Sequence, residues 1–174
     1  MGMKAISPTA TFGDDLYERD HAEWLEVQAA ALRQGRFDRL DVGNLLEEIE
    51  DLGSSLRREV ESRLETLIEH LVKLSVSRKP EPRAGWRATV REQRRQLARL
   101  FRDSPSLRRH AVAVFPVSLA EGCSEARSAL ADHEPENAQN HEAAIRAFSD
   151  LVSIEQVLDD KAFLELKQSA SRNA

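Results

Sequence analysis

The sequence of 174 residues contains a single cysteine, Cys123. One cysteine excludes an internal disulfide framework and a multi-cysteine metal site. Only 7 Gly and 6 Pro are present and β-branched runs are scarce, which favours helices over sheets. No apolar run approaches the roughly 18 residues that cross a bilayer, and the first fifteen residues lack the apolar core of a secretory signal. We therefore expect a cytoplasmic protein without a membrane association.

Charge is abundant and divided along the chain. Residues 14–69 carry 16 acidic and 7 basic residues, residues 78–110 carry 11 basic and 3 acidic, and residues 111–174 carry 11 acidic and 5 basic. The formal net charge is −5. Segments of opposite sign can neutralise one another when they pack as antiparallel neighbours, so this order is compatible with a helical bundle.

Apolar residues recur at spacings of three and four from Val42 to Leu74, which predicts one long helix over about 42–78. Gly53 is its weak point, but the apolar stripe keeps its phase there. Further helices are expected over about 16–34, 85–101, 105–130 and 141–152, with one more turn to Leu158. The predicted fold is all-α: a single-domain up-and-down bundle of four to five helices around the long one, with residues 1–14 a flexible arm and 168–174 a frayed tail.

The motifs of metal and nucleophilic catalysis are missing or incomplete. His141-Glu142 begins like HExxH, but Ile145 stands where the second His is required. Cys123 has no base nearby in sequence and is expected to be a buried, inert thiol. Four acids lie close together early in the long helix, and a pair of them could bind a hard cation, although solvated or arginine-paired acids are the more ordinary interpretation. No catalytic residue, metal ligand or cofactor is predicted. The four acids are Glu47, Glu48, Glu50 and Asp51.

An arginine face is the most suggestive feature of the chain. It belongs to the helix of residues 86–102, opposite an apolar side that includes Trp86. Guanidinium groups one turn apart could follow the phosphates of a nucleic acid, whereas neutralisation within the fold or contact with a partner protein are the alternatives. Its candidate residues are Arg87, Arg91, Arg94, Arg95 and Arg99.

Several ungapped blocks between residues 16 and 110 resemble the bacterial "domain of unknown function" family number twenty-nine, of cyanobacteria and proteobacteria. The blocks are Tyr17–Asp20 (YERD) with Trp24, Gly35–Asp41 (GRFDRLD), Asn44–Gly53 (NLLEEIEDLG), Trp86–Arg94 (WRATVREQR) and Asp103–Leu107 (DSPSL). After about Arg127 the chain departs from the pattern. The resemblance implies an all-helical fold and no established activity.

These observations favour a non-catalytic protein–protein interaction module over the other classes of function. Nucleic-acid binding through the helix of residues 86–102 is the alternative, and a metal-dependent enzyme using the acids of residues 47–51 is a weaker one. A protein partner and a homodimer are both compatible with the long helix. The acidic cluster and the arginine face are the surfaces where a partner is expected.

Overall fold

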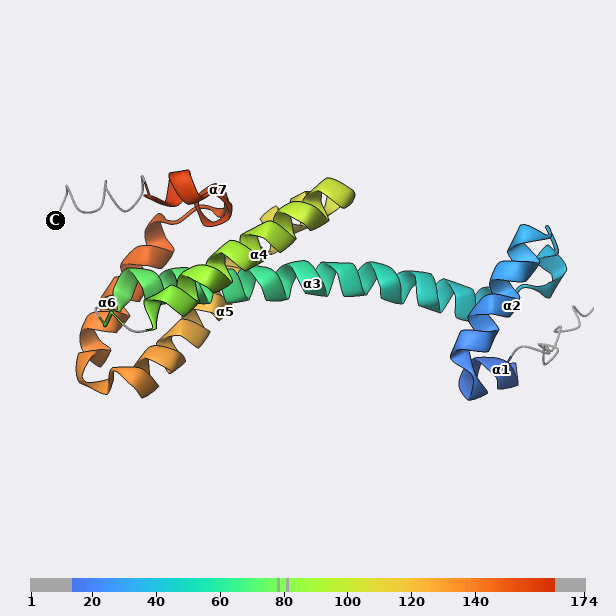
Figure 1. Ribbon diagram of the computed structural model, residues 1–174, viewed down its shortest axis with the longest axis horizontal. Coiled ribbons are helices and arrows are strands. Elements are labelled where there is room, and N and C mark those ends of the chain that lie inside the picture. Colours follow the sequence, from blue (N-terminus) through green and yellow to red (C-terminus); the bar gives the residue numbers. More distant parts are fainter. Residues whose placement is uncertain (1–13, 78, 81, 165–174) are drawn as a thin grey trace, which may run out of the picture. The chain divides into compact units, whose positions relative to one another are not determined.

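A computed structural model describes residues 14–77, 79–80 and 82–164, and every element in these ranges is helical (Figure 1). The all-α prediction is therefore confirmed. Of the expected arm of residues 1–14, only Asp14 is described, and it begins a helix; the rest of the arm and the expected tail of residues 168–174 lie outside the described residues. The elements are α1 (Asp14–Arg19), α2 (His21–Arg33), the 3-10 turn η1 (Phe37–Arg39), α3 (Val42–Val76), α4 (Arg83–Asp103), α5 (Ser106–His133), the 3-10 turn η2 (Pro135–Asn137), α6 (Ala138–Leu151) and α7 (Ile154–Leu158).

The chain divides into two compact units at Ser54 and Ser55, and α3 contributes residues to both. The first unit contains α1, α2, η1 and the start of α3. The second contains the rest of α3 and α4 to α7. The prediction of one domain is not decided by this division and stays a prediction.

The first helix of the prediction, over residues 16–34, is in fact two helices. Asp20 leaves the helical region with φ −148° and ψ 85°, and its side chain accepts a hydrogen bond from the backbone N–H of Glu23 at 3.0 Å. An aspartate that caps a new helix in this way competes with continuation of the old one. Gly35 ends the pair with a φ of 67°, as its place after α2 predicts.

The long helix α3 runs without a break through Gly53, as the phase of its stripe predicts, and it ends at Val76. Its two halves differ in burial. Every buried residue of α3 lies at or beyond Val60. The apolar stripe of residues 42–52 is mostly exposed, whereas its continuation from Val60 onward is buried.

The hydrophobic core of the second unit gathers side chains from α3 to α7. Leu64, Leu67 and Ile68 are fully buried, and Trp86 of α4 is 8% exposed, as its apolar position predicts. α5 approaches α3 at Gly122, where an added Cβ would lie 2.8 Å from the backbone O of Glu65. The close contact between these helices therefore requires a residue without a side chain.

Helix ends in the second unit differ from the predicted ones by a few residues. α4 spans Arg83–Asp103, and α5 begins at Ser106, with Pro105 at its N-cap. The predicted loop of residues 133–140 contains η2 and the first turn of α6. Ser153 caps α7 through a capping box with Gln156, which confirms the last predicted turn.

Candidate interaction surface

The first unit is held together around Asp41. Its Oδ2 accepts hydrogen bonds from Trp24 Nε1 at 3.2 Å and from Asn44 Nδ2 at 2.7 Å, and its Oδ1 accepts the backbone N–H of Asn44 at 3.3 Å. Its own N–H donates to Oε1 of the buried Gln28 at 2.9 Å. Asp41 therefore caps α3 and fixes α2 beside it. Several residues that carry the family resemblance meet at this point.

Glu48 is the second link between α3 and the first two helices. Its Oε1 accepts a hydrogen bond from the hydroxyl of Tyr17 at 2.7 Å, and its Oε2 lies 3.6 Å from Nε2 of His21. The hydrogen bond to Glu48 raises the pKa of Tyr17 to about 12, because only the protonated phenol can donate it, and repulsion between a phenolate and this carboxylate adds to the shift. Glu48 thus contributes to the packing of the first unit.

The other three acids of the predicted cluster form no hydrogen bond at this junction, although the charge of Glu47 adds to the raised pKa of Tyr17. Glu47, Glu50 and Asp51 are exposed, and none of them forms a hydrogen bond or ion pair within the described part of the chain. Within that part, no three His, Cys, Asp or Glu side chains are placed to hold a metal ion. The four predicted acids therefore separate into one structural residue and three solvated ones.

An apolar stripe lies on the first half of α3, and of these acids only Glu50 is at its edge. The stripe consists of Val42 at 66% exposure, Leu46 at 55%, Ile49 at 66% and Leu52 at 65%. Asp41, Asn44 and Glu48, which contact α1 and α2, lie on the neighbouring side of the helix. The helices of the first unit therefore leave the stripe uncovered. The sequence predicted its apolar character but not its exposure.

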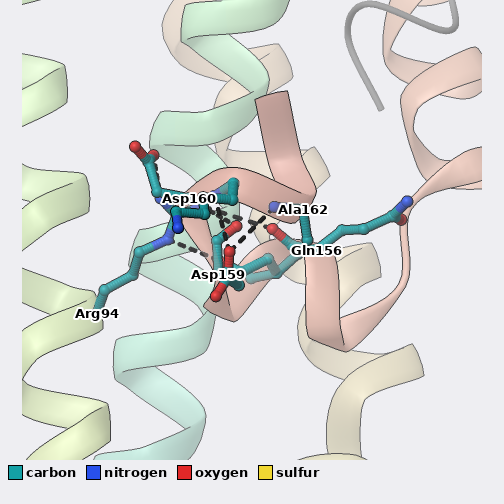
Figure 2. Close-up of polar contacts among 7 residues, drawn as sticks. Arg94, Gln156, Asp159, Asp160 and Ala162 are labelled. Atoms are coloured by element: carbon teal, nitrogen blue, oxygen red, sulfur yellow. Dashed lines mark hydrogen bonds and ion pairs between the residues drawn. The ribbon is translucent and has the colours of Figure 1, made fainter. Parts of the chain in front are cut away.

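Arg94 of the predicted arginine face is a structural residue. Its Nε donates to the backbone O of Val157 at 2.9 Å, and its Nη1 donates to Asp160 Oδ1 at 2.5 Å. Its Nη2 reaches the carbonyls of Gln156 and Asp159 at 3.5 and 3.4 Å (Figure 2). These carbonyls are at the C-terminal end of α7, where a helix lacks its own donors. Arg94 therefore anchors α7 to α4.

The remaining candidate arginines are exposed on α4. Arg95 pairs with Glu92, and Nε of Arg99 lies 3.8 Å from Oδ2 of Asp103, so two of them have carboxylate neighbours on their own helix. Arg87 and Arg91 form no ion pair with any described residue. Local carboxylates thus neutralise part of the face. Its predicted neutralisation by the acids of residues 47–51 stays a prediction.

A shallow groove of about 430 Å³ lies between α4, the start of α5 and the end of α7. Phe101 and Leu158 contribute apolar atoms to it, and Arg94, Arg102 and Arg108 line its edge. Arg94 is engaged with α7, and Nε of Arg102 lies 3.5 Å from Asp103. Because these two guanidinium groups already have acceptors, the groove is a weak place for an added anion.

A buried polar network joins the end of α3 to the start of α6, and sequence reasoning missed it. The hydroxyl of Ser77 donates to Oε1 of Glu134, and Oε2 of Glu134 lies 3.4 Å from Nε2 of His141. The three residues are 4%, 2% and 6% exposed, so no substrate reaches them. The only sequence signal was Glu134 beside Pro135, in a segment expected to be a loop. We interpret the network as structural.

Cys123 is buried, as predicted, and its burial raises the pKa of the thiol. A thiol held protonated in a core is a poor nucleophile. Among the helices of the described ranges, none combines the length and the apolar content that crossing a membrane requires.

A family model described as "Domain of unknown function DUF29" matches residues 16–163. The match continues past Arg127, where the sequence had seemed to depart from the family pattern. No curated protein and no solved structure matches the chain.

Proposed function

We propose that this chain, which belongs to the DUF29 family, is a non-catalytic protein–protein interaction module. The observation that carries the proposal is the exposed apolar stripe of Val42, Leu46, Ile49 and Leu52 on α3. Scattered apolar residues are normal on a protein surface, but a contiguous apolar row with a charged border is typical of a docking surface.

The free energy available from burying the stripe is large enough to contribute to a protein contact. Burying a Val, Leu or Ile side chain completely contributes about 1.5–3 kcal/mol. Four side chains that are 55–66% exposed therefore offer roughly 4–7 kcal/mol in gross terms. Association costs about 4 kcal/mol or more, so the stripe alone supports weak binding, and additional contacts at its border have to supply the rest.

The acids and the buried network support the non-catalytic part of the proposal. Glu47, Glu50 and Asp51 are exposed along the outside of α3, and they do not converge on a common point. The Ser77, Glu134 and His141 network is inaccessible to a substrate. Neither set therefore resembles a working acid–base or nucleophilic centre.

Site-specific photo-crosslinking in the native host tests the proposal. A benzophenone amino acid replaces Ile49, and a matched protein carries it at Val117 of the second unit, which is 65% exposed. We expect discrete protein adducts from position 49. Any adducts from position 117 should contain other proteins. The absence of adducts at position 49, or the same mixture at both positions, would contradict the proposal.

Nucleic-acid binding is the second candidate function, and the exposure of four arginines on α4 favours it: Arg87, Arg91, Arg95 and Arg99. The acidic net charge of the whole chain opposes it. Fluorescence anisotropy with mixed-sequence DNA and RNA at low salt tests for nucleic-acid binding. Binding that an Arg87→Ala, Arg91→Ala variant weakens would support this function, and undetectable binding would exclude it.

A further inference from the structure

The stripe on α3 has the geometry of one side of a helix–helix contact. Val42, Leu46 and Ile49 follow one another at spacings of four and three, and they lie within about 60° of one another around the helix axis. An amphipathic partner helix offers a complementary row of apolar side chains at the same spacing. All described elements are helices, so none of them offers a strand edge to which an extended peptide could add.

The border of the stripe specifies the charge of the partner. Glu50 lies one turn after Leu46 at the edge of the stripe, whereas Glu47 and Asp51 lie on the opposite side of α3. These carboxylates are exposed and have no hydrogen bond or ion pair among the residues that the structure describes. Residues 14–54 together contain 12 acidic and 4 basic residues, a net charge of −8. Basic side chains on the partner would pair with Glu50 and be attracted by the negative charge of this unit.

The same charge disfavours a second copy as the occupant. Pairing two stripes would bring together two segments that each carry a net charge of −8. Like charges across an interface oppose association, whereas opposite charges steer the partners together and fix their orientation. Resting on the proposed function above, we propose that the stripe binds an amphipathic helix of another protein whose apolar face is bordered by Lys or Arg residues.

A synthetic peptide of about 18 residues, or roughly five helical turns, serves as the probe. It carries Leu on one helical face and Lys on the other, and a fluorescent label reports its binding to the full chain. Two control peptides have Glu in place of Lys or the same Leu and Lys residues in scrambled order. We expect binding of the Leu/Lys peptide only, weakening as salt rises from about 0.02 to 0.5 M.

Two pairs of variants locate the binding on the chain. Ile49→Ser should weaken binding roughly tenfold, whereas Val117→Ser removes an equally exposed apolar residue elsewhere and should have no effect. Glu50→Gln should weaken binding several-fold, because Glu50 lies at the edge of the stripe. Glu47→Gln removes the same charge from the opposite side of α3 and should have much less effect.

Three results would overturn the inference while leaving the proposed function intact, provided that the crosslinking at position 49 succeeds. These are equal binding of the Lys and Glu peptides, no binding of either, and self-association of the chain that Ile49→Ser abolishes. The last result would identify a second copy as the occupant. If the crosslinking at position 49 fails, both proposals fail.

Discussion

Gly122 is the residue at which the packing of the second unit is least tolerant. A Cβ at this position would lie 2.8 Å from the backbone O of Glu65 and 2.8 Å from Cβ of Ile68. We expect Gly122→Ala to lower the free energy of unfolding by about 1–3 kcal/mol, because α5 has to move away from α3. Urea denaturation measures this loss.

The matched control for this prediction is Gly85→Ala. Gly85 is inside α4, and no atom lies within 4 Å of its virtual Cβ. Because alanine is the better helix former, this variant should be more stable by about 0.5–1 kcal/mol. Equal effects at the two positions would show that helix propensity, and not the close contact, decides the outcome.

Tyr17 reports on the assembly of the first unit because it is the single tyrosine of the chain. Its pKa of about 12 depends first on the hydrogen bond to Glu48. We expect the tyrosinate absorbance of the intact protein to rise well above pH 10. Glu48→Ala should bring the pKa back toward 10, the ordinary value of tyrosine. An unchanged titration in this variant would mean that Tyr17 and Glu48 do not meet in solution.

Glu65 gives the second unit a pH-dependent stability. Burial raises its pKa above 4.5, and Glu121, Glu61 and Glu125 add repulsion. The protonated form is therefore favoured on folding, so this stabilisation is present below pH 4.5 and is lost as pH rises through the raised pKa. At pH 7 we expect Glu65→Gln to be more stable than the natural protein, and the difference should disappear in acid.

Glu142 serves as the control because its pKa is shifted in the opposite direction. A hydrogen bond from Arg127 lowers its pKa, so its carboxylate stabilises the fold at neutral pH. Glu142→Gln should therefore be less stable at pH 7, and its deficit should shrink as pH falls through the lowered pKa. Thermal melts of both variants at pH 7 and pH 4 give the two differences. If both variants were more stable than the natural protein at pH 7, or both less stable, the directions given for the two pKa shifts would be contradicted.

At the scale of elements, periodicity and capping residues predict most of the helices but not their partners. The stripe of α3, the left-handed Gly35 and the Ser153 cap are local signals, and the structure agrees with each of them. The break at Asp20 was missed because apolar positions continue across it. An aspartate in a helical pattern can face solvent or act as a cap, and only the tertiary contact with α3 decides between them.

Arg94 shows how one side chain can hold a whole element. Its guanidinium group connects α4 to the C-terminal end of α7 and lies 5.8 Å from the centre of the Phe163 ring. We expect Arg94→Ala to cost about 1.5–3 kcal/mol and to speed up amide hydrogen exchange in residues 154–163 before other regions. Hydrogen-exchange mass spectrometry measures this order.

Arg94→Lys tests whether the positive charge of this side chain is enough to hold α7. A lysine keeps the positive charge but lacks the planar fork that reaches several carbonyls at once. It should therefore restore little of the protection of residues 154–163. Full protection in Arg94→Lys would show that charge alone fixes α7.

At the scale of the whole molecule, the second unit holds nearly all of the core. Its buried cluster runs from Val60 to Phe163, whereas the buried residues of the first unit in the described ranges are Trp24, Gln28 and Ala31. We expect a fragment of residues 55–174 to unfold cooperatively in urea. A fragment of residues 1–54 should show little helix alone, because so small a core does not offset the loss of chain entropy.

Circular dichroism of the two fragments checks this prediction. A gradual, non-cooperative transition in the fragment of residues 55–174 would show that its core depends on the first unit. Cooperative unfolding of the fragment of residues 1–54 would contradict the second half of the prediction.

The candidate site was harder to predict than the fold. Hydrophobic spacing identifies Ile49 and Leu67 as members of one stripe, but the first is exposed and the second is buried. Spacing cannot separate them, because exposure depends on which other helices reach each half of α3. In the same way, Arg94 and Arg95 look alike in sequence, and only the position of α7 makes the first an anchor.

The separation in sequence between Arg94 and its acceptors has a consequence for synthesis on the ribosome. Its acceptors lie 62–66 residues further along the chain, whereas Tyr17 and Glu48 are 31 residues apart. At about 5–20 residues per second, α7 emerges roughly 3–13 s after α4. The first unit and its stripe emerge earlier still. Because the first unit is expected to form little helix alone, the stripe becomes helical only when later helices pack on the rest of α3, so binding of a partner helix follows synthesis of the second unit.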